Sequence, residues 1–196
     1  MTSRAIIACG ALSTHIQNIV KTKNWNITIY PLPPILHNNP RLITTEVEKK
    51  WQEISALHES IAIAYADCGT YGELGKLTSK LGLQQLSGNH CYDTFAGAKR
   101  IESLQASEPG TFFLTDFLVR SFSRSVIADL GIDRFPDLKS DYFRHYQKIH
   151  WLSQNPNEEL RQSAKSIADF LELELTEEYV GEKGLIKELE RFMMQP

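Results

Sequence analysis

The stretch IIACGAL, residues 6–12, decides the interpretation of the fold, because an apolar run passes directly into Cys9 and Gly10. A continuous apolar run is typical of a strand that is buried on both faces of a parallel sheet. The stretch AIAYADCGT, residues 62–70, repeats this arrangement and ends in Cys68 and Gly69. The two stretches together predict parallel strands that each end in a cysteine–glycine turn.

Short apolar strands alternate with helical patterns along the first two-thirds of the chain. Parallel neighbours need crossover connections, so this alternation predicts an α/β fold with a doubly wound, mostly parallel sheet flanked by helices. The periodicity predicts an added C-terminal helical segment over about residues 137–172, with helices at 139–153 and 157–172. We expect a single α/β domain over residues 1–196.

The composition excludes several classes of protein. A net charge of −3 with interspersed charges gives no electrostatic attraction to nucleic acid. No apolar run approaches the roughly 20 residues that a membrane span needs. We therefore expect neither nucleic acid nor a membrane as a partner. Three cysteines cannot form a disulfide framework, and we expect a cytoplasmic protein with free, catalytic or metal-bound thiols.

All three cysteines follow predicted strands. Cys91, in GNHCYDTFAG (residues 88–97), comes after a short fourth strand, as Cys9 and Cys68 follow theirs. The carboxyl ends of parallel strands meet at one edge, where α/β proteins bind ligands, so we expect the three thiols to hold one metal. Three protein ligands leave one position open on zinc, and the alternative is a [4Fe-4S] cluster with one open iron. His90 is a competing ligand or a supporting catalytic group.

The residues that follow these cysteines are expected to line the bound cofactor. Gly10 and Gly69 allow tight turns and close approach of a ligand, and Thr70 follows the second of them. Asp67 precedes Cys68 and is interpreted either as a ligand-orienting group or as an ordinary turn residue.

Three further residues are candidate catalytic groups. Asp116 ends the predicted fifth strand and begins a helix, where it could also act only as a helix cap. Tyr142 and His145 share one face of the helix predicted over 139–153, and His145 is the candidate proton carrier. An aromatic stripe of this kind is also typical of core packing. His15, His37 and His58 are interpreted as surface or loop histidines without a role.

Six motifs together resemble domain-of-unknown-function family 1638 over most of the chain. They are IIACGAL, LPPILHNNPRLI (32–43), YADCGTYG (65–72), GNHCYDTFAG, EPGTFFLTDFLVRSF (108–122) and DYFRHYQKIHWL (141–152). The resemblance implies a cytosolic bacterial or archaeal protein with Cys9, Cys68, His90 and Cys91 in its defining motifs. Some relatives are encoded near corrinoid-dependent methyl-transfer systems, so a corrinoid-pathway protein is a candidate partner, and the resemblance supplies no reaction.

The leading functional hypothesis is a metal-dependent transferase or lyase. Thiolate-bound zinc suits alkyl transfer to a small thiol better than hydrolysis, because the ligand set is rich in negative charge. The alternatives are an oxygen-sensitive iron–sulfur enzyme and a binding protein that carries a metal or serves a corrinoid enzyme. A fourth hypothesis is that the cysteines only pack as small hydrophobic residues and that the protein binds an organic ligand in the same crevice. Assembly into a homo-oligomer is left open.

Overall fold

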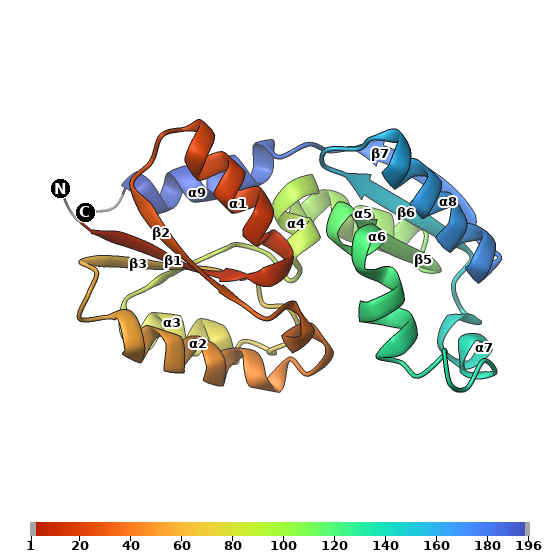
Figure 1. Cartoon of the computed structure of the whole chain (residues 1–196), viewed down its shortest axis with the longest axis horizontal. Coiled ribbons are helices and arrows are strands. Elements are labelled where there is room, and N and C mark those ends of the chain that lie inside the picture. Colours follow the sequence, from red (N-terminus) through yellow and green to blue (C-terminus); the bar gives the residue numbers. More distant parts are fainter. Residues whose placement is uncertain (1–2, 195–196) are drawn as a thin grey trace. The chain divides into compact units, whose positions relative to one another are not determined.

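The computed structural model describes residues 3–194, and the chain within them divides into two compact units. The first unit consists of the described residues up to Thr94 together with those from Lys183 onward. The second unit is Phe95–Glu182. The chain therefore leaves the first unit once and returns to it for its last helix. Figure 1 labels the elements of both units.

The first unit contains a four-stranded parallel sheet in the order β2-β1-β3-β4. Its strands are β1 (Arg4–Cys9), β2 (Ile27–Leu32), β3 (Ser60–Ala64) and the two-residue β4 (Gln84–Gln85). The central strands β1 and β3 are buried along almost their whole length, as their apolar sequences require for a sheet that is covered on both faces. In this order the chain runs from β1 outward to β2 on one side and to β3 on the other, so ligands are expected at the carboxyl ends of β1 and β3.

Helices cover both faces of this sheet. In Figure 1, α1 and α9 lie on one side of it, and α2 and α3 lie on the other. Each helix buries an apolar stripe at helical spacing, as in α1, where Leu12, Ile16 and Ile19 face inward. The helical elements of this unit are α1 (Gly10–Thr22), the short 3-10 helix η1 (Pro34–Asn38), α2 (Arg41–Ile54), α3 (Glu73–Leu81), α4 (Cys91–Ala96, which crosses into the second unit) and α9 (Lys183–Met194).

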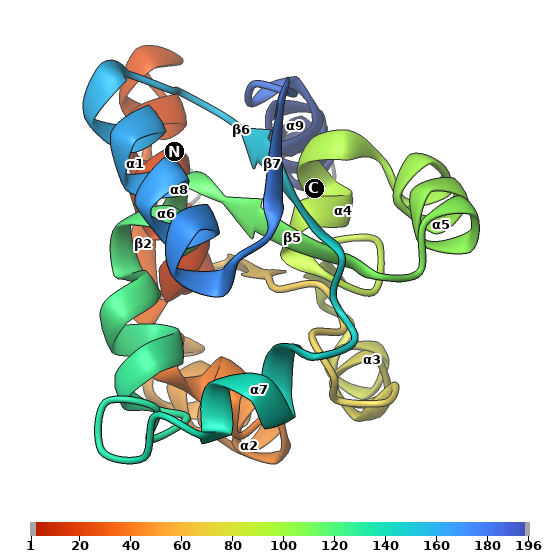
Figure 2. The same ribbon diagram turned by 90° about the vertical axis from the view of Figure 1, so that its right-hand side faces the viewer.

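The second unit has its own parallel sheet in the order β5-β6-β7. Figure 2 shows α6 and α8 side by side on one side of these strands and α5 on the other. The core beneath α6 and α8 is formed by Leu114, Trp151, Phe122 and Ile167, among others. The elements of this unit are α5 (Ala98–Ser107), β5 (Thr111–Thr115), α6 (Asp116–Phe122), the π-helical turn η2 (Ser123–Ala128), α7 (Leu138–Phe143), β6 (Lys148–Ser153), α8 (Glu158–Leu171) and β7 (Glu174–Tyr179).

The α/β class with parallel strands and flanking helices is confirmed, and the strands lie in two sheets. The helical segment predicted over 137–172 is wrong in its middle, because 148–153 is the central strand β6 of the second sheet. This strand is buried between two neighbours, and its side chains Ile149 and Trp151 are enclosed on the α8 side. The segment pairs with β5 on one edge and with β7 on the other, and this pairing outweighs its apparent helical spacing. Its β-branched and aromatic residues also suit a buried strand.

A single glycine divides a helix that the sequence predicts as continuous from about Tyr92 to Leu104. Gly97 has a φ of 89°, which lies outside the helical region, so α4 ends before it and α5 begins after it. Glycine adopts such a positive φ without the cost that a Cβ atom imposes.

Candidate functional site

Each of the four strands of the first sheet leads at its carboxyl end to a residue that can bind a metal. Cys9 is the last residue of β1, and His37 lies on η1, directly after β2. Cys68 lies in the turn after β3, and Cys91 begins α4 after β4. Because all four strands are parallel, their carboxyl ends meet at the same edge.

The first contact in this group joins Cys9 to His37. The Sγ atom of Cys9 is fully buried and lies 3.7 Å from Nε2 of His37. The Nδ1–H of His37 donates to the carbonyl oxygen of Pro34 at 3.1 Å, which directs Nε2 toward the sulfur. Gly10 makes this approach possible, because a Cβ atom there would lie 2.5 Å from the carbonyl oxygen of Leu32.

The turn that carries Cys68 is held by Asp67. The carboxylate of Asp67 accepts hydrogen bonds from the hydroxyl of Thr70 at 2.8 Å and from the backbone N–H groups of Tyr71 and Gly72 at 3.0 and 2.8 Å. Burial raises the pKa of Asp67, but these hydrogen bonds outweigh it and lower the pKa below its ordinary value. Cys68 itself has a φ of 50°, an unfavourable conformation for a residue with a side chain, which is found preferentially at functional sites.

The turn that carries Cys91 is held in a similar way by Asp93. This buried carboxylate accepts hydrogen bonds from the backbone N–H groups of Asn89 and His90 at 2.7 and 3.0 Å. The two cysteine turns are also bonded to each other, because the backbone N–H of Cys68 donates to the carbonyl oxygen of Asn89 at 2.7 Å. The positions of Cys68 and Cys91 are therefore set by one connected network.

The thiols and His37 strongly alter one another's protonation. The pKa of Cys91 is lowered well below its ordinary value, first by a hydrogen bond from Cys68 and then by His37, against the effect of burial. The pKa of Cys68 is raised correspondingly, by the same contact and by burial. Burial lowers the pKa of His37, but contacts with Cys9 and Cys91 outweigh it and raise the pKa to about 11. In the metal-free site these contacts favour a thiolate at Cys91 beside a protonated His37.

Tyr65 completes the surroundings of the thiols. Its side chain is fully buried, and its ring stacks on that of His37 at a centroid distance of 6.1 Å and an angle of 19°. Burial and the charges of the three cysteines raise the pKa of Tyr65, so the hydroxyl keeps its proton. The hydroxyl oxygen has no hydrogen-bond partner among the residues that the structure describes.

The donor set fits a thiophilic metal ion. A sulfur and a nitrogen that bind one tetrahedral zinc ion lie roughly 3.5 Å apart, given bond lengths of about 2.3 and 2.0 Å, and Cys9 and His37 lie close to this separation. No three His, Cys, Asp or Glu side chains within residues 3–194 are already grouped as a metal-binding set. Binding therefore requires the side chains to move inward from their present positions.

Sequence reasoning missed both His37 and Tyr65. His37 was expected to be a loop histidine without a role, although it lies at the same sheet edge as the cysteines and in the motif LPPILHNNPRLI. Of the predicted residues near the thiols, Thr70 is buried and bonds Asp67, and Gly69 has a φ of 83°. His90 is partly exposed and stacks on Tyr92 at 4.7 Å.

The other predicted catalytic residues belong to the second unit. Asp116 is fully buried, and its carboxylate accepts hydrogen bonds from Trp151 Nε1 at 3.0 Å and from the backbone N–H groups of Gln154 and Asn155 at 3.2 and 2.7 Å. These bonds tie the end of β5 to β6 and the turn after it. The expectation that His145 lies on a buried helical face is wrong, because α7 ends at Phe143 and the His145 side chain is exposed. Tyr142 is 46% exposed on α7, and the catalytic roles of all three residues stay predictions.

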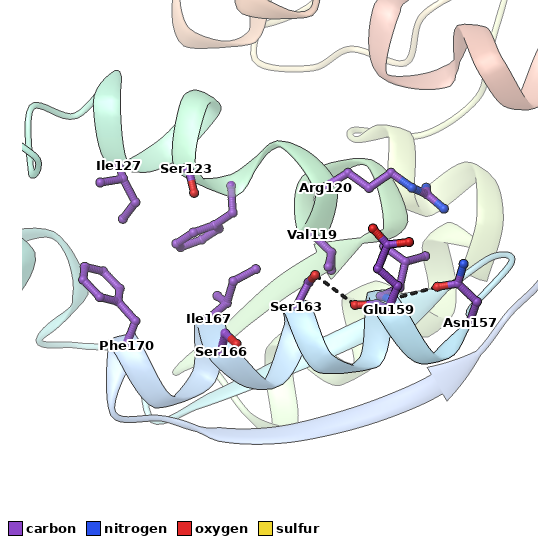
Figure 3. A pocket seen from close by; sticks show the side chains of 12 residues that line it. Val119, Arg120, Ser123, Ile127, Asn157, Glu159, Ser163, Ser166, Ile167 and Phe170 are labelled. Carbon is purple, nitrogen blue, oxygen red and sulfur yellow. Dashed lines mark hydrogen bonds between the residues drawn. The ribbon is translucent and has the colours of Figure 1, made fainter.

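The second unit also has a groove, of about 690 Å³, between α8 and the helices α6 and η2 (Figure 3). Apolar side chains and serines line most of it, and Arg120 and Glu159 lie toward one end. The hydroxyl of Ser163 donates to the carbonyl oxygen of Glu159 within the same helix, so it is already satisfied. No pattern in the sequence predicted this groove.

The fold and the thiols define a class of α/β protein with a thiol-rich site at the carboxyl ends of its strands. The chain belongs to the family described as "Protein of unknown function (DUF1638)", whose family model matches residues 31–189 and therefore begins after Cys9. No curated protein and no solved structure matched the chain significantly. None of the described helices is long and apolar enough to cross a membrane.

Proposed function

We propose that the chain binds one zinc ion through the thiolates of Cys9, Cys68 and Cys91, with Nε2 of His37 as a fourth donor. The observation that carries this proposal is that each strand of one parallel sheet leads, at the shared carboxyl edge, to one thiol or imidazole. The hydrogen bond from His37 Nδ1 to Pro34 supports it, because histidines that bind metals through Nε2 commonly anchor Nδ1 to a carbonyl oxygen.

We propose alkyl transfer to a small thiol as the reaction. Zinc bound by thiolates lowers the pKa of a substrate thiol and keeps its sulfur nucleophilic at neutral pH. The three cysteine thiolates would remain bound to the metal. His37, which lies on a 3-10 segment of five residues, is the donor that the substrate thiol would displace. The substrate sulfur would form a bond to the alkyl carbon while the bond from that carbon to its leaving group breaks, and the thiol proton would pass to solvent.

His37 also favours a second candidate, a metal-holding protein without turnover. Four protein donors form a closed set, which is typical of sites that do not react. The two candidates differ in whether an added thiol can displace His37.

Metal analysis of anaerobically purified protein tests the shared site. We expect one zinc ion per chain in the wild-type protein and loss of the metal in Cys9→Ser, Cys68→Ser and Cys91→Ser. His145→Ala, an exposed histidine of the second unit, serves as the matched control and should keep the metal. Absence of stoichiometric metal from the wild type, or full retention in Cys68→Ser, would contradict the proposal. Absorption in the visible range would instead identify an iron–sulfur cluster.

A further inference from the structure

Tyr65 presents a buried polar group that no residue within 3–194 satisfies. The residue follows β3 and comes three positions before Cys68, and its side chain is fully buried. Its ring stacks on that of His37, whose Nε2 lies 3.7 Å from Sγ of Cys9, yet its hydroxyl makes no hydrogen bond to any described residue. The side chain therefore lies beside the thiol site with its hydroxyl unsatisfied.

A buried hydroxyl without a partner is costly. Leaving such a group unsatisfied costs the free energy of removing it from water, whereas phenylalanine fills the same volume without this cost. Of the four other buried side-chain oxygens without partners among the described residues, Asp93 Oδ1 and Thr94 Oγ1 belong to the segment that directly follows Cys91. Unsatisfied polar atoms thus occur in the chain shortly before Cys68 and directly after Cys91, and a bound molecule at the thiol site would supply a partner for Tyr65.

We propose that the hydroxyl of Tyr65 donates a hydrogen bond to a small thiol compound bound at the cysteine cluster, with the sulfur of that compound as the acceptor. This inference rests on the proposed function. Tyr65 is suited to the task because its ring stacks on His37, the donor that an incoming thiol would replace. The hydroxyl would then meet the sulfur at the position that Nε2 leaves, so Tyr65 acts as a positioning residue for the substrate.

Cobalt-substituted protein tests this role directly, with 2-mercaptoethanol as the probe. The visible spectrum of Co²⁺ changes when an added sulfur enters its coordination, so the spectrum reports thiol binding without requiring turnover. We expect Tyr65→Phe to keep one metal ion per chain and to bind 2-mercaptoethanol about tenfold more weakly than the wild type. Tyr179→Phe, at an exposed tyrosine of the second unit, should bind it as the wild type does.

The outcomes separate this inference from the proposed function. If Tyr65→Phe keeps its metal and binds the probe as tightly as the wild type, the hydroxyl is satisfied by water and the inference is wrong, while the metal site stands. If Tyr65→Phe loses the metal, the hydroxyl supports the site rather than the thiol, which also overturns the inference. If the wild-type protein binds no metal, both the inference on Tyr65 and the proposed function are wrong.

Thermal unfolding of the protein free of metal and thiol supplies a second readout. Tyr65→Phe should unfold at the same temperature as the wild type or at a higher one, because it removes an unsatisfied buried group. A lower unfolding temperature would show that the hydroxyl has a structural partner, and the proposed role in thiol binding would then be wrong.

Discussion

Nε2 of His37 lies 3.7 Å from Sγ of Cys9, although the two residues are 28 positions apart in the chain. Cys9 ends β1, and His37 follows β2, so pairing of these neighbouring strands produces the contact. The same imidazole lowers the pKa of Cys91, which extends its influence across the sheet edge to the segment after β4. His37 is therefore the residue through which the protonation of the site can be examined.

The stability of the metal-free protein should show a distinctive dependence on pH. In the folded protein His37 keeps its proton up to its pKa of about 11, and the lowered pKa of Cys91 favours the thiolate, whereas the unfolded chain titrates at the ordinary pKa values of 6.5 and 9.0. Below pH 6.5 the unfolded chain binds more protons, so stability rises with pH. Between pH 6.5 and 9.0 the proton counts are equal and the contribution of the pair is flat. Above pH 9.0 the folded protein binds more protons, so the contribution of the pair falls until the pKa of His37, about 11, is passed. The raised pKa of Cys68 adds a further loss of stability above pH 9.0.

His37→Ala isolates this effect, and denaturant unfolding over a series of pH values measures it. Without the imidazole, the hydrogen bond from Cys68 still lowers the pKa of Cys91 below that of the unfolded thiol, so stability should keep rising with pH up to 9.0. The slope approaches about 1.4 kcal/mol per pH unit. Parallel curves for the variant and the wild type would show that His37 and Cys91 do not form this ion pair.

Gly10→Ala should damage the site through the backbone. The added Cβ would lie 2.5 Å from the carbonyl oxygen of Leu32 and 2.7 Å from Cδ of Pro34, so the segment that carries His37 must shift. We expect destabilisation by about 1–3 kcal/mol and weaker metal binding. Gly75→Ala, inside α3, meets only Gln85 at 4.0 Å and should be neutral or stabilising. Equal behaviour of the two variants in unfolding and metal titration would refute the steric argument.

Asp67→Ala should loosen the turn that presents Cys68. The variant loses three hydrogen bonds to the carboxylate, so we expect it to lose about 1–3 kcal/mol of stability. Asp67→Asn keeps one acceptor oxygen and should lose less. Zinc affinity should fall in the same order, because the turn no longer holds the strained φ of Cys68. The exposed Asp141→Ala is the control, and a metal affinity unchanged in Asp67→Ala would rule out this positioning role.

Asp116→Asn should destabilise the protein without altering metal binding. The carboxylate now accepts a hydrogen bond from each of three N–H groups at a fully buried position. In the variant the amide nitrogen is itself a donor, so it would face one of these N–H groups without a hydrogen bond. A loss of about 2–3 kcal/mol follows from replacing a charged acceptor of three hydrogen bonds. Unfolding measured by tryptophan fluorescence suits this test, because Trp151 is one of the donors. A variant with native stability and impaired alkyl transfer would restore the catalytic role predicted from the sequence.

The position of the cysteines could be predicted because it depends on a rule of topology. Cys9 ends a strand, and Cys68 and Cys91 each follow one. The rule that parallel strands share a carboxyl edge needs only the strand assignments. His37 obeys the same rule, but three prolines separate the predicted strand from it, and the sequence does not reveal that η1 turns its ring back toward Cys9. Tyr65 could not be recognised because an unsatisfied hydroxyl is visible only in three dimensions.

The segment around β6 shows a different limit of sequence reasoning. In DYFRHYQKIHWL, the residues Tyr142, His145, Tyr146 and Ile149 recur at helical spacing, which predicted one helix. The structure ends that helix at Phe143 and pairs 148–153 with strands on both sides. Pairing partners far along the chain decided the conformation, and no local pattern contains them. The division of the strands into two sheets has the same origin.

The return of the chain to its first unit has a consequence for how the protein is made. The guanidinium of Arg4 donates a hydrogen bond to the carbonyl oxygen of Met193 at 2.7 Å, and α9 covers one face of the first sheet. A ribosome delivers β1 before the whole of the second unit and α9 after it. The sheet that positions the thiols therefore stays uncovered on part of one face until the second unit has been synthesised, and during that time its cysteines are exposed to modification.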